Sequence, residues 1–372
     1  MKNASQPLLE EYQLGDLTLK NRVVMASLTR GRATNPDLLP TMLMSEYYAQ
    51  RASTGLILSE GTWVNMQSIG FINVPGIYTQ EQVEGWKIVT NAVHESGGLI
   101  FSQLGHIGAG AHPDLQNGEL PVGPSAINIQ SKSFTPEGFK DTVTPREMTV
   151  TEIHRTIQDY RQAAQNAKDA GFDGIEIHAI AGMLIPQFLS KATNHRTDEY
   201  GASIENRTRI VFEILDAVTE VWDSHRVAIK FSPVMLSNVG IVKPDEETIV
   251  LFKYILNKLE NYNLAFVHIV GPSEDLSGTD VEELQKDYFT HFRNNYRGRI
   301  LANLGFSKES ANVILKKGDA DLVSFGELFI ANPDLVERFK YNLPLSESDP
   351  NTYYSGEDNG YITYPKSGYA ES

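Results

Sequence analysis

Short runs of apolar residues recur along the chain, and longer segments with a helical repeat separate them. Each run is four or five residues long and nearly all apolar, which is typical of strands covered on both faces in a parallel sheet. The pattern predicts eight such strands: Val23–Ala26, Leu56–Ser59, Leu99–Gln103, Gly174–His178, Val227–Phe231, Ala265–Ile269, Ile300–Asn303 and Leu322–Phe325.

The intervening segments predict amphipathic helices. Thr149 and Glu152 form a capping-box pattern, and the helix that follows, Glu152–Ala170, would end before a glycine. Further helices are predicted after Ser203 and over Glu81–Glu95 and Glu246–Leu259. Eight strands that each precede a helix predict a (β/α)8 barrel. A doubly wound open sheet is the alternative, but no glycine-rich G-x-G-x-x-G loop follows an early strand.

We expect a single barrel domain over residues 1–372, because no linker rich in Pro, Gly or Ser divides the chain. The segment 105–146 is rich in Gly, Pro, Asn and Ser, and we expect it to form a lid over the top of the barrel. The tail, residues 349–372, is rich in tyrosine and glycine and is expected to fold back onto the barrel.

The chain has 372 residues, with 32 Lys and Arg against 47 Asp and Glu, and a formal net charge of −15. This acidity argues against nucleic-acid binding and against attraction to an anionic membrane, both of which need a basic surface. The absence of cysteine excludes disulfides and thiolate chemistry, and the histidines lack metal-ligand spacing, so no metal site is predicted. Met1–Tyr12 carries no apolar signal segment, and we expect a cytoplasmic enzyme. The sequence does not indicate an oligomeric state.

Several longer motifs occur along nearly the whole chain: Lys20–Ala26 with Leu28–Arg30, Ser102–Leu104, Gly174–His178, Arg196–Gly201, Ser203–Arg207, Ile330–Leu335 and Gly360–Pro365. In their order and composition they resemble the old yellow enzyme family of flavin-dependent ene reductases. The resemblance implies FMN at the strand tips, reduction of that FMN by NADPH, and hydride transfer to the β-carbon of a small conjugated carbonyl compound.

The resemblance also assigns roles to single residues. Those implied to contact FMN are Ser27, Thr29, Gly61, Gln103, Lys230, Gly305 and Gly326. His178 matches the donor that polarises the substrate carbonyl, and Tyr354 matches a substrate-facing tyrosine. His106 lies close to an altered pocket position and is a further candidate for moving a proton.

On the substrate side the chain departs from the family pattern. The second carbonyl donor, Asn or His in the family, is Ala181, and the proton-donating tyrosine is Met183. Neither side chain carries a transferable proton. The usual tryptophan after Gln103-Leu104 is Gly105, so we expect an enlarged pocket, lined by Gly105, Ala181, Met183, Thr29 and Gln103.

On the cofactor side, the arginine expected to pair with the flavin phosphate is Glu327, which reverses the sign of that interaction. The glycine after the seventh strand is Leu304, and the arginine at the ring edge is Lys230. Leu304 and Glu327 therefore mark a degenerate phosphate site. Lys230 is expected either to pair with Glu327 or to hold an anion.

These departures favour a protein without a cofactor that binds a conjugated carbonyl. We expect a redox-neutral isomerisation or cyclisation, such as a pericyclic closure, in natural-product biosynthesis. His178 would polarise the carbonyl, and Tyr354 or His106 would move a proton. One alternative is an FMN- and NADPH-dependent ene reductase with an atypical proton donor. A second is a non-catalytic barrel that binds a ligand.

Overall fold

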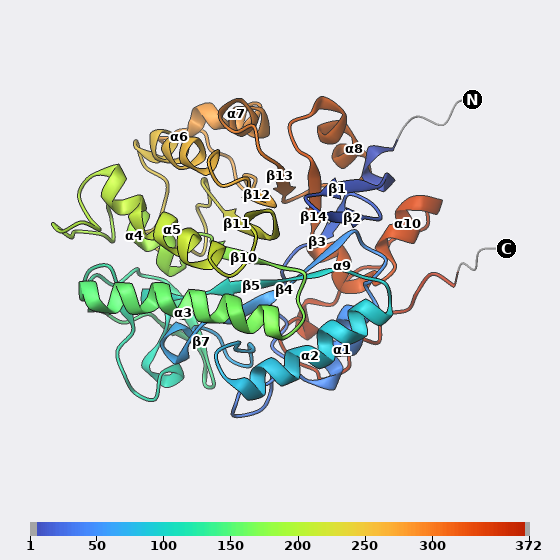
Figure 1. The fold of residues 1–372 in the computed structure, drawn as a ribbon, viewed down its shortest axis with the longest axis horizontal. Helices are drawn as coiled ribbons and strands as arrows, with labels where there is room; N and C mark the ends of the chain where they lie inside the picture. Colours follow the sequence, from blue (N-terminus) through green and yellow to red (C-terminus); the bar gives the residue numbers. More distant parts are fainter. Residues whose placement is uncertain (1–5, 369–372) are drawn as a thin grey trace.

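The computed structural model describes residues 6–368, and a closed barrel of eight parallel strands forms its centre (Figure 1). Each strand pairs with the next one along the chain, and the last closes on the first. The barrel strands are β3 (Val23–Met25), β4 (Leu56–Trp63), β5 (Ile100–Gly105), β10 (Gly174–Ala179), β11 (Val227–Phe231), β12 (Phe266–Val270), β13 (Ile300–Asn303) and β14 (Leu322–Phe325). The predicted (β/α)8 barrel is confirmed, and each predicted run overlaps one of these strands, with Ala26, Leu99 and Ala265 falling just outside them. The open-sheet alternative is wrong.

The helices cover the outside of the barrel (Figure 1). They are α1 (Met42–Ala49), α2 (Gln80–Glu95), α3 (Val150–Asp169), α4 (Leu184–Leu189), α5 (Ile204–Thr219), α6 (Thr248–Leu259), α7 (Tyr288–Asn295), α8 (Lys308–Lys317), α9 (Glu327–Ala331) and α10 (Leu335–Tyr341). Thr149 and Glu152 form the predicted capping box at the start of α3. Gly171 follows the end of α3 with φ +81°, a left-handed conformation that glycine adopts without a Cβ clash.

The interior of the barrel is apolar at the amino ends of the strands. Phe101, Ala228, Phe266, Leu301 and Leu322 point inward there and form one buried cluster. A hairpin of β1 (Tyr12–Leu14) and β2 (Leu17–Leu19) adds its leucines to this cluster and plugs that end.

The interior becomes polar two residues further along the same strands. Because side chains alternate between the two faces of a strand, the residue two positions after an inward apolar residue also points inward. Those positions hold Gln103, Lys230, His268, Asn303 and Ser324. The carboxyl end of the barrel, where the loops that follow the strands begin, therefore has a polar floor.

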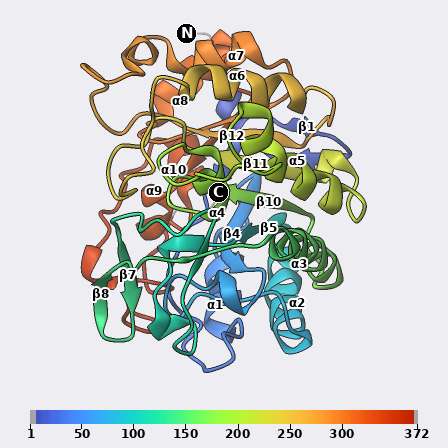
Figure 2. The same ribbon diagram turned by 90° about the vertical axis from the view of Figure 1, so that its left-hand side faces the viewer.

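The segment 105–146 contributes two small sheets. In one, β6 (Val122–Gly123) pairs with β9 (Arg146–Glu147), and in the other β7 (Lys132–Thr135) pairs with β8 (Gly138–Asp141). Figure 2 shows the β7–β8 hairpin beside the red carboxyl-terminal part of the chain. Ring contacts join them, since the Phe134 ring centre lies 4.9 Å from that of Phe71 and 6.3 Å from that of Tyr354.

Two buried arginines hold the carboxyl-terminal segment on the barrel. Arg32 is 3% exposed and donates to the carbonyl oxygens of Thr352, Ser355 and Glu357 at 2.9, 2.6 and 3.1 Å. Arg30 donates to further carbonyl oxygens of the same segment. Residues 349–368 therefore lie against the barrel, while 369–372 of the expected tail lie outside the described residues.

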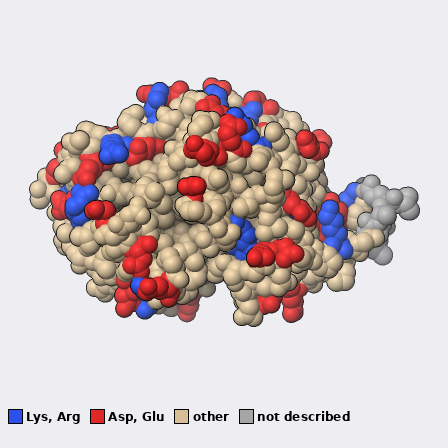
Figure 3. Space-filling model, turned by 90° about the horizontal axis from the view of Figure 1, so that it is seen from below, with Lys and Arg blue, Asp and Glu red and all other residues tan. Residues whose placement is uncertain are grey.

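Charged residues of both signs are interspersed on the face shown in Figure 3, around a broad area without charged atoms. Across residues 6–368, no helix combines the length and the apolar character that crossing a membrane requires.

We expect Arg32→Lys to loosen the carboxyl-terminal segment while the barrel stays folded. Lysine keeps the charge but loses the fork that reaches several carbonyl oxygens at once. One lost charge-assisted hydrogen bond costs about 1.5–3 kcal/mol. Backbone amides of residues 350–362 should therefore exchange hydrogen at least about tenfold faster by mass spectrometry. Arg161→Lys, at an exposed ion pair with Glu220, is the matched control, and equal exchange in both variants would contradict the assignment.

Candidate active site

A cavity of about 750 Å³ lies at the carboxyl ends of the strands. The ends of β3, β11, β13 and β14 contribute its inner lining, and α8 and α10 contribute its outer part. Of the predicted cofactor residues, it brings together Ser27, Lys230, Gly305 and Gly326, along with the two altered positions Leu304 and Glu327.

Lys230 is a buried ammonium ion without an ion pair. Lys230 is 6% exposed, and no carboxylate oxygen of residues 6–368 lies within 4.0 Å of its Nζ, the limit for a salt bridge. The expected pair with Glu327 is therefore absent, although both residues line this cavity. Burial lowers the pKa of Lys230, and the charge of Glu176 opposes that shift. A buried cation that lacks a close counter-ion favours an anionic or electron-rich ligand.

His178, Lys230 and His268 occupy paired positions on β10, β11 and β12. Burial lowers the pKa of His178 to about 3, and the charge of Lys230 adds to this shift. The ring is therefore neutral at pH 7. Its Nδ1 is buried without a hydrogen-bond partner.

Glu176 is the buried carboxylate of the barrel interior, and the sequence analysis did not single it out. Its oxygens accept hydrogen bonds from Gln103 Nε2 at 2.6 Å and His268 Nδ1 at 2.7 Å. Burial raises the pKa of Glu176, but His268, Lys230 and the hydrogen bond from Gln103 outweigh burial and hold the pKa below its usual value. Burial lowers the pKa of His268 to about 4. At pH 7 the pair is a carboxylate with a neutral imidazole.

At the outer end of the cavity, the backbone keeps the shape of a glycine turn. Leu304 has φ +92° and Gly305 has φ +71°, and the left-handed region costs a leucine about 1–2 kcal/mol. Glu327 is exposed and makes no ion pair with any of residues 6–368. Lys308 lines the same end and donates to Asn342 Oδ1 at 2.6 Å, and within the described part of the chain it pairs with no carboxylate.

A second cavity, of about 1150 Å³, lies between the β7–β8 hairpin and residues 236–243. Tyr354 lines it, is 43% exposed, and has its ring centre 5.3 Å from that of Phe71. The neighbouring Tyr353 instead bonds Ser348 Oγ at 2.7 Å. Tyr354 is thus the tyrosine of this segment that faces open space.

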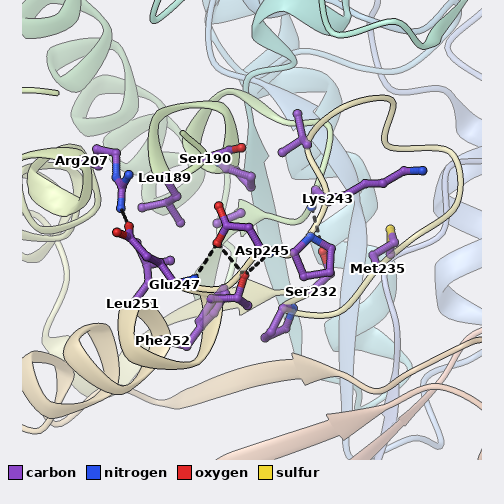
Figure 4. Close-up of a pocket in the computed structure, with 17 residues that line it drawn as sticks. Leu189, Ser190, Arg207, Ser232, Met235, Lys243, Asp245, Glu247, Leu251 and Phe252 are labelled. Carbon is purple, nitrogen blue, oxygen red and sulfur yellow. Dashed lines mark hydrogen bonds and ion pairs between the residues drawn. The ribbon is translucent and has the colours of Figure 1, made fainter. Parts of the chain in front are cut away.

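Ala181 lines a small pocket of about 60 Å³ between the loops after β10 and β11 (Figure 4). Its backbone N–H donates to Ser232 Oγ at 2.7 Å, and the ion pair of Arg207 with Glu247, at 2.6 Å, lies on another wall. This volume holds only a few water molecules, so the alanine does not create the large extension that was expected.

Met183 fills the space that Gly105 was expected to open. A Cβ built at Gly105 would stand 3.0 Å from Met183 Cε and 3.6 Å from His178 Cβ. Met183 is 6% exposed and packs with Trp63 in an apolar cluster. The expected enlargement is therefore absent at this position, because a side chain from another loop occupies it.

The other predicted residues lie deeper or nearby. His106 is fully buried, its Nδ1 accepts from the N–H of Gly108 at 3.0 Å, and burial lowers its pKa to about 3. It lines none of the cavities described above. Gly61 lies beside the Gln103 amide oxygen, 3.5 Å from where a Cβ would stand. Thr29 is partly exposed and follows Leu28, which lines the first cavity. Among the described residues, no cluster of three acidic or histidine side chains is placed to hold a metal ion.

The NADH:flavin oxidoreductase / NADH oxidase family matches residues 7–346. The flavin oxidoreductase hxnT of Emericella nidulans is 39% identical over 379 residues, 97% of each chain. The 12-oxophytodienoate reductase 7 of Oryza sativa subsp. japonica is 38% identical, over 98% of this chain and 96% of that one. A structure of morphinone reductase in complex with tetrahydroNAD superposes with a TM-score of 0.90 at 40% identity, over 97% and 98% of the two chains. An old yellow enzyme homologue from Zymomonas mobilis gives 0.89 at 38% identity, over 96% and 99%.

These matches confirm the resemblance and correct the expectation about the cofactor. The prediction of a protein without a cofactor is wrong, because the family that matches residues 7–346 is one of NADH:flavin oxidoreductases and the hxnT relative is a flavin oxidoreductase that aligns over 97% of this chain. That prediction gave most weight to Leu304 and Glu327 at the outer end of the cavity. The lone cation at its floor was not visible from the sequence.

We expect the His178 ring to stay neutral between pH 5 and 8. Its pKa of about 3 lies well below the ordinary value near 6.5, so the ring gains no proton in this range. Its proton NMR signal, identified by its loss in His178→Gln, should not move between pH 5 and 8 in the folded protein. The same histidine should titrate near pH 6.5 in urea. A midpoint near 6.5 in the folded protein would contradict the assigned environment.

Proposed function

We propose that this chain, which belongs to the NADH:flavin oxidoreductase / NADH oxidase family, is an ene reductase that uses FMN and a reduced nicotinamide. Its substrate would be a small α,β-unsaturated carbonyl compound. The observation that carries the proposal is Lys230, a buried ammonium ion without an ion pair at the floor of the strand-tip cavity. An electron-rich ring edge supplies what this cation lacks.

The residues that line the cavity fit FMN. Ser27 and Gly326 lie at the ends of β3 and β14, and Lys230 would meet the electron-rich edge of the ring. Gly305 leaves open space where a Cβ would stand, so an anionic group can approach the backbone there. Lys308 lines the same end, while the Glu327 carboxylate opposes a phosphate. Bound FMN supplies hydride transfer from the nicotinamide to the β-carbon of the substrate.

His178 would polarise the substrate carbonyl. Its ring is neutral at pH 7, and a hydrogen bond from the protonated ring nitrogen to the carbonyl oxygen would stabilise negative charge that develops there. Ala181 offers no second donor, and loss of one such donor typically costs about 3–4 kcal/mol of transition-state stabilisation. We therefore expect activated substrates to react best.

Tyr354 is the proposed source of the proton for the α-carbon. Met183 carries no transferable proton, and His106 is enclosed away from the cavities. Tyr354 is exposed to the larger cavity and belongs to the segment that Arg30 and Arg32 hold on the barrel. The contacts with Phe71 and Phe134 orient its ring.

The other two functions rest on weaker observations. The comparisons give no support to a redox-neutral isomerisation or cyclisation, and the space expected at Gly105 for a larger substrate is filled by Met183. A non-catalytic barrel would not need the partly buried His178 at the position paired with Lys230. Neither observation favours these functions over hydride transfer.

The purified protein should retain FMN after gel filtration and show its visible absorbance band. NADH or NADPH should bleach the band without oxygen, and an enone should restore it. His178→Ala should keep the flavin but slow this return about 10²–10³-fold, the usual cost of one lost donor.

His154→Ala is the matched control, because His154 is exposed on α3 and should leave the rate unchanged. A protein that stays colourless after incubation with excess FMN would overturn the proposed function. Retention of FMN with an unchanged rate in His178→Ala would overturn the role of His178 alone.

A further inference from the structure

A continuous chain of buried polar side chains crosses the barrel interior under the strand-tip cavity. Gln103 donates to Glu176, and Glu176 bonds His268 on the opposite oxygen. His268 Nε2 lies 3.0 Å from Ser324 Oγ, and Asn303 Nδ2 lies 2.8 Å from the same oxygen. Gln103, Glu176, His268 and Ser324 are each at most 2% exposed. The chain connects five of the eight barrel strands.

The ionised carboxylate fixes the direction of the two hydrogen bonds that it accepts in this chain. Glu176 can only accept, so Gln103 Nε2 and His268 Nδ1 both donate to it. The neutral imidazole then has an acceptor at Nε2, 3.0 Å from Ser324 Oγ, and the Ser324 hydroxyl has a second acceptor in the carbonyl oxygen of Ala302 at 3.3 Å. Ser324 Oγ in turn accepts from the Asn303 amide nitrogen. The amide oxygens of Gln103 and Asn303 remain as acceptors. That of Gln103 lies beside Gly61, and Asn303 is one of the residues that line the cavity.

The same carboxylate also sets the charge under the cavity. Burial lowers the pKa of Lys230 and the Glu176 carboxylate opposes that shift, while pKa values of about 3 and about 4 leave His178 and His268 neutral at pH 7. Glu176 acts on Lys230 through space, without a direct ion pair. The Lys230 side chain therefore remains available to a ligand, with the Glu176 carboxylate as the charge that acts on it.

We propose that Glu176 and His268 are positioning residues for the flavin, which tune its reduction potential and its affinity without touching it. Glu176 balances the charge of Lys230. His268 is oriented by its hydrogen bond to Glu176 and, through Ser324, helps to fix the side chain of Asn303 on the other side of the barrel. This inference rests on the proposed function, since it concerns how the same cavity treats bound FMN.

Glu176→Gln removes the charge while keeping the size of the side chain and its capacity to form hydrogen bonds. Two-electron reduction adds negative charge to a flavin, so an unbalanced Lys230 should favour the reduced form. At the midpoint potential of the wild type, the ratio of reduced to oxidised FMN should rise at least tenfold in E176Q. That corresponds to about 30 mV for a two-electron couple. The reduction potential of bound FMN is measured by equilibration with a reference dye of known potential.

His268→Gln leaves the carboxylate in place and interrupts the path to Ser324 and Asn303. We expect FMN to bind at least tenfold more weakly to this variant, with a reduction potential close to that of the wild type. Ser102→Ala is the matched control for both variants. Ser102 is fully buried and bonds Thr62 across the barrel wall at 3.3 Å, outside the chain described above.

A reduced-to-oxidised ratio in E176Q within twofold of the wild type would overturn the inference and leave the proposed function standing. If H268Q and S102A bind FMN with equal affinity, the inference is likewise overturned and the proposed function still stands. If E176Q fails to fold, the affinity of H268Q decides the proposal. A wild-type protein that does not retain FMN overturns both the proposed function and this inference.

Discussion

The lone ammonium group of Lys230 inside the barrel is the constraint around which the site is organised. A charge in an apolar interior is unfavourable unless groups nearby compensate for it. Here the compensation is indirect, because Glu176 acts on Lys230 without an ion pair and is itself held by Gln103 and His268. The cation faces the strand-tip cavity, and His178 is its register neighbour on β10. The cofactor pocket and the carbonyl donor are thus arranged around one charge.

The residues around the two cavities belong to two kinds of element, the barrel strands and the segments that cover the ends of those strands. The floor is made of strand residues whose positions are fixed by the ladder of the barrel. Outside the strand ends, the strand-tip cavity is lined by residues of α8 and α10, while the β7–β8 hairpin, residues 236–243 and the carboxyl-terminal segment with Tyr354 line the second cavity. Arg30 and Arg32 attach that segment through its backbone carbonyls, so its position does not depend on the side chains it presents. Substrate preference can therefore change in the covering without disturbing the floor.

The apolar runs predicted the fold because each barrel strand is buried on both faces at its amino end. The same runs also contained the polar floor, since Phe101 and Gln103, or Phe266 and His268, differ by the two-residue period of one strand face. The pattern of apolar and polar residues along the chain does not show which residues far apart in the sequence come into contact. Met183 fills the space at Gly105 from another loop, and Lys230 lies without the partner that Glu327 suggested. The prediction about the cofactor therefore relied on two altered positions at the outer end of the cavity, Leu304 and Glu327, and not on the polar residues that come together only in the folded barrel.

The most direct measurement of this account is the affinity for FMN of the wild type and of Lys230→Met, by isothermal titration calorimetry on the apoprotein. Lys87→Met, which removes an exposed lysine paired with Glu84, is the control for loss of net charge. The account predicts that Lys230→Met binds FMN at least about tenfold more weakly, a loss of about 1.4 kcal/mol, while Lys87→Met matches the wild type. Equal affinity in all three proteins would show that the buried cation is not what holds the flavin, and would contradict the central claim.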